Sequence, residues 1–139
     1  MRTFKQMKAR VREILDSAGY NDTLIYLGPD LRDYGGTYVL LTPYGGPGLD
    51  LEGVIDQRGW QVRCVGSQMD DNDESTAEGI ADAIDIAFIS QHSQSIQGSW
   101  VVGVQRVGGA PASLNTNDDA NRTHFVCSYT VSVELALPN

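Results

Sequence analysis

Residue types that commonly carry chemistry are sparse in this chain of 139 residues. His92 and His124 are the only histidines: His92 falls in residues 91–98, which we expect to be a polar connector, and His124 falls on the polar face of the last predicted strand. A zinc or related centre needs several ligands at matched spacings, and neither histidine is accompanied by such a set. We therefore expect no metal site.

The acidic run at residues 70–74, D-D-N-D-E, resembles the start of a calcium-binding loop. The loop requires Gly at its sixth position and Glu at its twelfth, and this sequence lacks both. The run instead precedes residues 75–78, S-T-A-E, which match a capping box. Carboxylates are favoured at the positive end of a helix dipole, so we interpret the run as helix-capping charge.

Familiar catalytic motifs are missing from the sequence. It contains no G-x-S-x-G, H-E-x-x-H, C-x-x-C or G-x-G-x-x-G motif. Residues 44–48, Y-G-G-P-G, lack the Lys-Ser/Thr of a phosphate-binding loop. A pair of catalytic carboxylates stays open among 18 acidic residues, but nothing singles one out. The sequence predicts no catalytic, cofactor-binding or metal-ligating residue, no cofactor, and a protein that is not an enzyme.

Two amphipathic helices are expected to position the remaining features. Residues 3–18 combine a capping box at Thr3 and Gln6 with a stop at Gly19. The second helix begins at the capping box of residues 75–78. Apolar stripes at helical spacing support both helices: Phe4, Met7, Val11, Ile14 and Ala18 in the first, and Ile80, Ala83, Ile84, Ala87 and Phe88 in the second. We place Asp82 and Asp85 on the outer face of the second helix.

Most of the expected strands are short. Residues 44–48 are expected to form a mobile loop, residues 49–58 are ambiguous, and residues 108–121 form a long polar loop. Alternating or β-branched runs bounded by turn residues predict the strands: residues 23–27, 37–42, 59–66, 100–107 and 122–135.

The last of these strands, Arg122 to Leu135, alternates most strictly. Such alternation predicts one face in a core and one in water. Its length suggests that it crosses the whole molecule and that one end protrudes to meet a partner, since an open edge invites pairing. The odd positions are Thr123, Phe125, Cys127, Tyr129, Val131, Val133 and Leu135, and the polar even positions are His124, Ser128, Thr130, Ser132 and Glu134.

These elements predict one α+β domain over residues 1–139. Its expected architecture is a mixed, mainly antiparallel sheet of about four to five strands packed against two helices. Cys64 and Cys127 fall at apolar positions of strands and are interpreted as core residues in a reducing compartment, with a disulfide as the alternative. No apolar run is long enough for a membrane span, and no signal-peptide core is present.

Charge is unevenly distributed along the chain. The formal net charge is −8, yet residues 1–12 carry five basic side chains and no acidic one. The remainder, with 18 acidic and five basic side chains, carries −13. This balance argues against general nucleic-acid binding and suits either simple solubility or a channel through which DNA slides without sticking.

The order of these elements resembles the tail-terminator proteins of long-tailed bacteriophages, also described as minor capsid or head–tail joining proteins. The resemblance lies in the helix Ser75–Phe88, the strand Trp100–Val107 and the closing sequence N-R-T-H-F-V-C-S-Y-T-V-S-V-E-L. It implies a virion structural protein that forms a hexameric ring, caps the tail tube and joins it to the head connector. Its implied partners are its own copies, the major tail-tube protein and the connector, with DNA only as passing cargo and no membrane.

The resemblance also implies a location in the tail neck of the virion, after assembly in the host cytoplasm. The alternative is a small cytoplasmic ligand-binding or enzymatic domain with a site near Tyr44, Trp60 and Trp100. Loops and the polar face of the last strand supply the predicted assembly interface: Tyr44, Pro47, Leu114, Asn117, Arg122, His124, Ser128 and Thr130.

Overall fold

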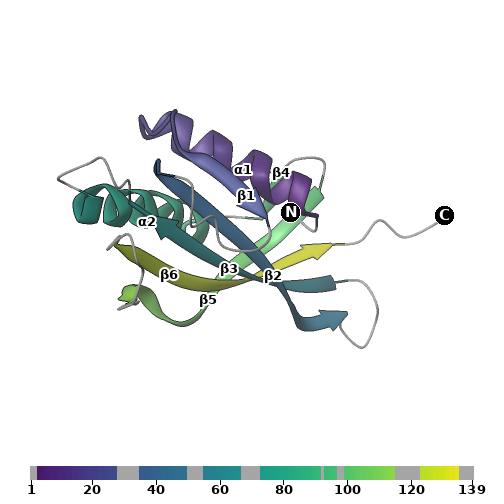
Figure 1. Cartoon of the computed structure of the whole chain (residues 1–139). Helices are drawn as coiled ribbons and strands as arrows, with labels where there is room; N and C mark the ends of the chain where they lie inside the picture. Colours follow the sequence, from purple (N-terminus) through teal and green to yellow (C-terminus); the bar gives the residue numbers. More distant parts are fainter. Residues whose placement is uncertain are drawn as a thin grey trace.

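The fold is a curled six-stranded sheet with two helices, shown in Figure 1. The computed structural model describes residues 3–27, 35–49, 55–66, 73–91, 93–96, 99–114 and 123–134, without the side chains of 46–49, 73–75, 99 and 114. The elements in chain order are α1 (Phe4–Ser17), β1 (Leu24–Leu27), β2 (Tyr38–Leu49), β3 (Ile55–Val65), α2 (Asp73–Ile89), β4 (Gln94–Ile96), β5 (Ser99–Leu114) and β6 (His124–Glu134).

The strand order across the sheet is β1-β2-β3-β6-β5-β4. Only β1 and β2 are parallel, and the other neighbours are antiparallel. The α+β class is confirmed, although the sheet has six strands rather than four to five. The additional strand is β4, a three-residue strand within a segment expected to be a polar connector.

Helix α1 begins as its sequence predicts. The Thr3 hydroxyl accepts a hydrogen bond from the Gln6 N–H, and the Gln6 side chain accepts one from the Thr3 N–H, at 3.2 Å each. Such a cap stabilises a helix by about 1 kcal/mol. The chain leaves the helix through Gly19, whose φ of 89° suits a residue without a Cβ.

Arg12 fastens α1 to the chain that follows it. Its guanidinium donates to the carbonyls of Tyr20 and Thr23, at 2.9 and 2.6 Å. The same side chain pairs with Asp16 at 2.9 Å. The turn that leads into β1 is therefore held against α1 by charge-assisted hydrogen bonds.

One apolar core lies between the two helices and the sheet. It joins residues of α1, α2 and all six strands. The expected helix stripes contribute to it except for Ala18, which is exposed at the C-cap of α1. Helix α2 begins at Asp73, so Ser75 lies inside its first turn and not at the cap as predicted. The buried members of the helices are Met7, Val11, Ile14, Leu15, Ala77, Ile80, Ala81, Ile84 and Phe88.

The alternation of β6 is confirmed on its core face, where every described odd position from Phe125 to Val133 is buried. The other face departs from expectation at one end. His124 is only 1% exposed, although a solvated position was predicted. It pairs with Val65, which joins Tyr38 and Leu40 in a second apolar cluster on the face away from the helices.

Within its described residues β6 offers no open edge, and the end that was expected to protrude, beyond Glu134, lies outside the described residues. β6 pairs with β3 along one side and with β5 along the other, so its backbone groups are used within the sheet. The open borders are elsewhere. β4 pairs only with Ser99–Val101, and in the described part of the chain nothing pairs with the outer edge of β5 beyond them.

Two strands run further than their sequences suggested. β2 continues through the Gly/Pro segment 44–48, which was predicted to be a loop, because a register shift between Tyr44 and Gly48 absorbs the irregular residues. β5 continues to Leu114 in the same way, with a shift between Val107 and Ala112. Residues 115–122 of the predicted loop and strand lie outside the described residues.

Candidate functional site

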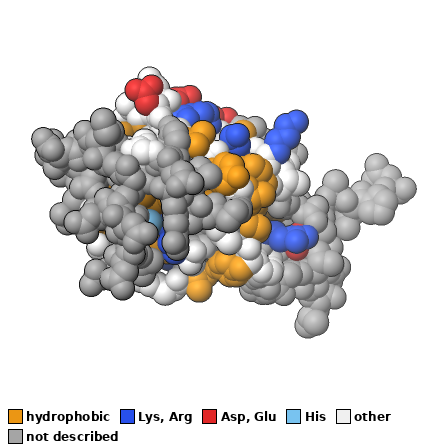
Figure 2. Space-filling model, in the orientation of Figure 1, with side chains coloured by type: hydrophobic (Ala, Val, Ile, Leu, Met, Phe, Trp, Pro, Cys, Tyr) orange, Lys and Arg blue, Asp and Glu red, His pale blue; other side chains and the backbone are white. Residues whose placement is uncertain are grey.

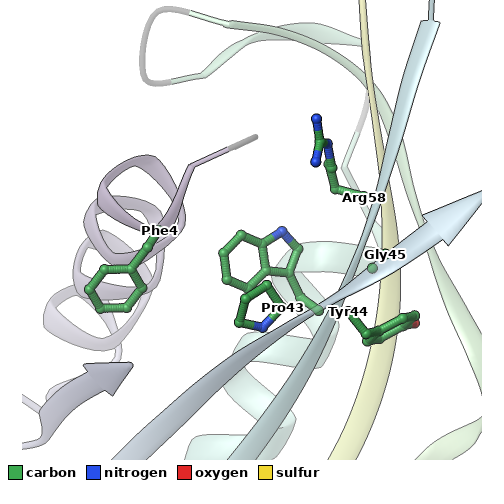
Figure 3. Close-up of a pocket in the computed structure, with 7 residues that line it drawn as sticks. Phe4, Pro43, Tyr44, Gly45 and Arg58 are labelled. Atoms are coloured by element: carbon green, nitrogen blue, oxygen red, sulfur yellow. The ribbon is translucent and has the colours of Figure 1, made fainter. Parts of the chain in front are cut away.

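The candidate binding site is a cleft where the first turn of α1 faces β2 and β3. Its volume is about 330 Å³. Figure 3 shows Phe4 of α1 across from Pro43 of β2, Arg58 at one end, and the Tyr44 ring on the opposite side of the strands. The lining residues are Phe4, Pro43, Tyr44, Gly45, Arg58, Gly59 and Trp60.

Gly59 allows the Tyr44 ring to lie flat on the sheet. The two residues are register partners on β2 and β3, and a Cβ on Gly59 would lie 2.0 Å from Tyr44 Cε2. The ring crosses β3 at this point, and its hydroxyl donates to the carbonyl of Tyr129 on β6 at 3.3 Å. A side chain at residue 59 would displace the ring, so glycine is required by close approach.

Two hydrogen-bond donors, on Arg58 and Trp60, distinguish this cleft from a purely apolar one. Arg58 Nε donates to the buried carboxylate of Asp56 at 2.7 Å, while 46% of the Arg58 side chain stays exposed. Trp60 is 2% exposed, and its Nε1 has no acceptor among the described residues. A buried donor without an acceptor is rare and costly, so the Trp60 N–H is a hydrogen-bonding group that the described residues leave unsatisfied.

A second polar arrangement lies at the border of the core between α2, β5 and β6, where Asp85 and Tyr129 are buried and Arg106 is exposed. Arg106 Nε donates to Asp85 Oδ1 at 2.9 Å, and its Nη2 donates to Oδ2. The Tyr129 hydroxyl donates to the same Oδ1 at 2.8 Å, and the Tyr129 ring meets Phe88 edge-on, with 4.9 Å between centroids. We call Asp85, Arg106 and Tyr129 the core network.

The prediction that Asp85 lies outside α2 is wrong, because Asp85 is only 4% exposed. A charged carboxylate is buried only when it is paired, and the bidentate guanidinium and the phenol supply those pairs. The sequence held a signal for this placement. Asp85 follows the buried Ala81 by four residues and precedes the buried Phe88 by three, so it falls on the widened apolar face of α2.

The protonation states in the core network favour a structural role over a catalytic one. Hydrogen bonding by Arg106 lowers the pKa of Asp85 below its ordinary value of 3.8, although burial opposes this shift. Burial raises the pKa of Tyr129 and of the neighbouring thiol of Cys127. The carboxylate therefore stays charged at neutral pH while the phenol and the thiol stay protonated, an arrangement without an activated nucleophile.

Both cysteines are buried free thiols, which confirms their interpretation as core residues. Burial raises the pKa of Cys64 as well. Within the described ranges, no group of His, Cys, Asp or Glu is arranged to hold a metal ion. His92 and most of the acidic run 70–74 lie outside these ranges.

The predicted interface residues are only partly brought together. Register places Tyr44 beside Gly59 and Gly59 beside Thr130, so Tyr44, Ser128 and Thr130 share the sheet face away from the helices. His124 lies buried at the far end of β6. The backbones of Pro47 and Leu114 lie in β2 and β5, whereas Asn117 and Arg122 fall outside the described residues. Trp100, expected near Tyr44 and Trp60 in the alternative reading, is half exposed on β5 and does not line the cleft.

No family model matches this chain, and no curated protein matches it. Solved structures do share its fold. A chain from a structure described as the virion of a native gene transfer agent (GTA) particle aligns with a TM-score of 0.55 at 17% identity, covering 95% of this chain and 91% of that one. A second solved chain, whose name states no activity, gives a TM-score of 0.52 at 17% identity over 99% of this chain and 100% of that one. At this identity the likeness shows a shared fold.

In the described part of the molecule, neither helix is long and apolar enough to cross a membrane.

Proposed function

We propose that this chain is a structural protein of a phage-like virion, acting as a tail terminator. The observation that carries the proposal is the end-to-end similarity in fold to a chain of a gene transfer agent particle. In this role copies of the chain form a ring, hexameric by analogy with tail terminators, that caps the tail tube and joins it to the head connector. The chain performs no catalysis, and its place is the tail neck.

The open sheet borders supply the surfaces for contact between copies. Beyond Val101 the outer edge of β5 carries the exposed side chains of Val102 and Val107, which are 41% and 50% exposed. The opposite border is β1, where Leu24 is also exposed. Two different borders on one sheet allow a head-to-tail contact, which closes into a ring when the rotation between copies is right. Unpaired edges of this kind favour added strands.

Charge supports a role in which DNA passes without binding. The chain carries a net charge of −8, and basic side chains gather over α1, as Figure 2 shows. An acidic ring repels the phosphate backbone, whereas a protein that grips DNA needs clustered cations along its binding path. The basic helix α1 would then face an acidic partner protein.

Assembly on tail tubes tests the proposal. Purified chain is mixed with tubes of its own tail protein and imaged by negative-stain electron microscopy. The expected result is a ring of this protein at one end of each tube and an arrest of tube growth. Tubes that keep growing with bare ends at saturating protein would overturn the terminator role.

A matched pair of variants tests the β5 edge. Val102→Glu combined with Val107→Glu places charges on the open edge, which disfavours strand addition. Ile86→Glu places a charge on the exposed surface of α2, where Ile86 is 63% exposed, away from both borders. We expect the edge variant to stay folded and to lose ring assembly, while the α2 variant still assembles. Loss of assembly in both variants, or in neither, would remove β5 from the contact.

The second candidate is a small ligand-binding domain, and the cleft at Tyr44 and Trp60 favours it. It predicts a stable monomer that retains a small molecule through purification. Native mass spectrometry separates the two candidates, because it reports the number of copies and any bound mass together.

A further inference from the structure

The cleft beside Trp60 combines apolar walls with unsatisfied donors. Phe4 and Pro43 supply the apolar walls, and the Tyr44 ring lies on the opposite side of the strands (Figure 3). Trp60 Nε1 is buried without an acceptor among the described residues, and within those residues only the Nε of the Arg58 guanidinium is hydrogen-bonded. The site therefore offers donors for which the described residues provide no acceptor.

Among the described residues, the exposed charges near the cleft are positive. The Arg58 side chain is half exposed, and the Lys8 Nζ lies 6.0 Å from the centroid of the Phe4 ring. The nearby carboxylate of Asp56 is only 2% exposed and is paired with Arg58. On a chain with a net charge of −8, this is a local cationic site, and an anionic group on the occupant complements it.

The form of the cleft favours a chain segment over an enclosed metabolite. Arg58, at one end of the cleft in Figure 3, has a side chain that is 46% exposed to solvent. Pockets for small molecules typically bury most of the ligand surface, whereas the exposed Arg58 leaves this cleft open to solvent at one end (Figure 3). An extended peptide that inserts one side chain and passes over the rim fits such a surface.

We infer that the cleft binds a peptide segment of a partner protein in which an Asp or Glu stands next to an apolar side chain. The apolar side chain lies against Phe4 and Pro43, and the carboxylate accepts hydrogen bonds from the Arg58 Nη atoms and from Trp60 Nε1. Binding then satisfies the buried indole N–H. The inference stands apart from ring assembly, since the isolated chain is sufficient for it.

The indole N–H itself provides the measurement. The chain has two tryptophans, so a ¹H–¹⁵N spectrum has two indole signals, and Trp100→Phe assigns the remaining one to Trp60. The probes are acetyl-Gly-Leu-Glu-Leu-Gly-amide and the same peptide with Gln in place of Glu. We expect a saturable shift of the Trp60 signal, with roughly tenfold tighter binding of the Glu peptide, as a charge-assisted hydrogen bond predicts.

Two arginine variants on one strand give the control. Arg58→Gln removes the cationic donor of the cleft and should abolish the preference for Glu over Gln. Arg63→Gln removes the same charge from β3, but Arg63 pairs with Leu40 and Val126 on the other face of the sheet, so the preference should remain. A Trp60 signal that does not move, or equal affinity for both peptides in the wild-type chain, would overturn the inference. A shift that grows with protein concentration alone would assign the cleft to a second copy and overturn it as well.

Discussion

The hydroxyl of Tyr129 donates a hydrogen bond to Asp85 Oδ1 at 2.8 Å, and so β6 is joined to α2 through a buried carboxylate. Arg106 of β5 binds both oxygens of the same carboxylate. The core network thus ties three elements that are far apart in the chain, and its geometry gives the first two predictions.

Replacing Asp85 by Asn should destabilise the fold by about 1–3 kcal/mol, because Arg106 then loses its buried counter-charge. This loss of stability is smaller than that expected on breaking a fully buried ion pair, because the Arg106 side chain is 33% exposed and water compensates part of the loss. Urea unfolding followed by circular dichroism measures the change. Asp82→Asn on the exposed face of α2 is the control, with a change within about 0.5 kcal/mol. Equal changes in the two variants would contradict a structural role for the core network.

The core network should also make stability depend on pH in the acid range. The pKa of Asp85 lies below its ordinary value of 3.8 in the folded chain. A lowered folded pKa contributes stability that is complete above the unfolded pKa, about 3.9, and is lost as the pH falls through the folded value. The stability gap between wild type and Asp85→Asn should therefore be constant from about pH 8 to about pH 5 and shrink below about pH 4. Urea midpoints over this series measure the gap, and a gap that persists unchanged at about pH 3 would contradict the assignment.

Gly59→Ala tests the contact between β3 and the Tyr44 ring. A Cβ at this position would lie 2.0 Å from the ring, so we expect a loss of about 1–3 kcal/mol from overpacking. Tyr44→Ala removes the obstructing ring, and the double variant should recover part of this loss. A double-mutant cycle by urea unfolding gives the coupling energy, expected to be about 0.5–3 kcal/mol. Additive changes would mean that the ring does not rest on residue 59.

The two faces of β6 should respond differently to charge. Phe125→Asp removes a buried aromatic side chain, which costs about 3–5 kcal/mol on truncation alone, and adds an unpaired charge, so the domain should unfold. Ser128→Asp lies on the partly exposed face and should leave a folded chain with only a small change in melting temperature. Thermal melts followed by circular dichroism compare them. A wild-type melt for Phe125→Asp would show that the assigned faces are reversed.

Much of the local structure was predictable because it depends on neighbours in the chain. The stripe of α1, its cap at Thr3 and the alternation of β6 each follow from residues a few positions apart. Strand ends were less predictable. The register shifts in β2 and β5 let Gly- and Pro-rich segments remain paired, and such bulges depend on the partner strand.

The shift after Val101 also explains an ambiguity in β5. Strict alternation groups Trp100 and Val102 with Val104, yet the first two are exposed and Val104 is buried. One extra residue at the bulge between Val101 and Gly103 changes the parity of the strand. No pattern within residues 99–107 specifies that extra residue.

The candidate sites were the least predictable features. Asp85 meets Arg106 across 21 positions and Tyr129 across 44. The cleft joins Phe4 to residues 43–45 and 58–60. Tyr44 and Trp60 were singled out from their residue types. The N–H donors of Arg58 and Trp60 come together at one cleft only when the sheet is assembled, so the sequence does not reveal them.

The central place of β6 has a consequence for biosynthesis. β6 lies between β3 and β5 in the sheet but follows both of them in the chain. The sheet is therefore completed only after residues 124–134 have left the ribosome. Until then a nascent chain presents two unpaired strand borders, which favours chaperone binding and slow, late closure of the domain. Pulse proteolysis of ribosome-bound chains of increasing length should show protection appearing in one step, once the final strand has emerged.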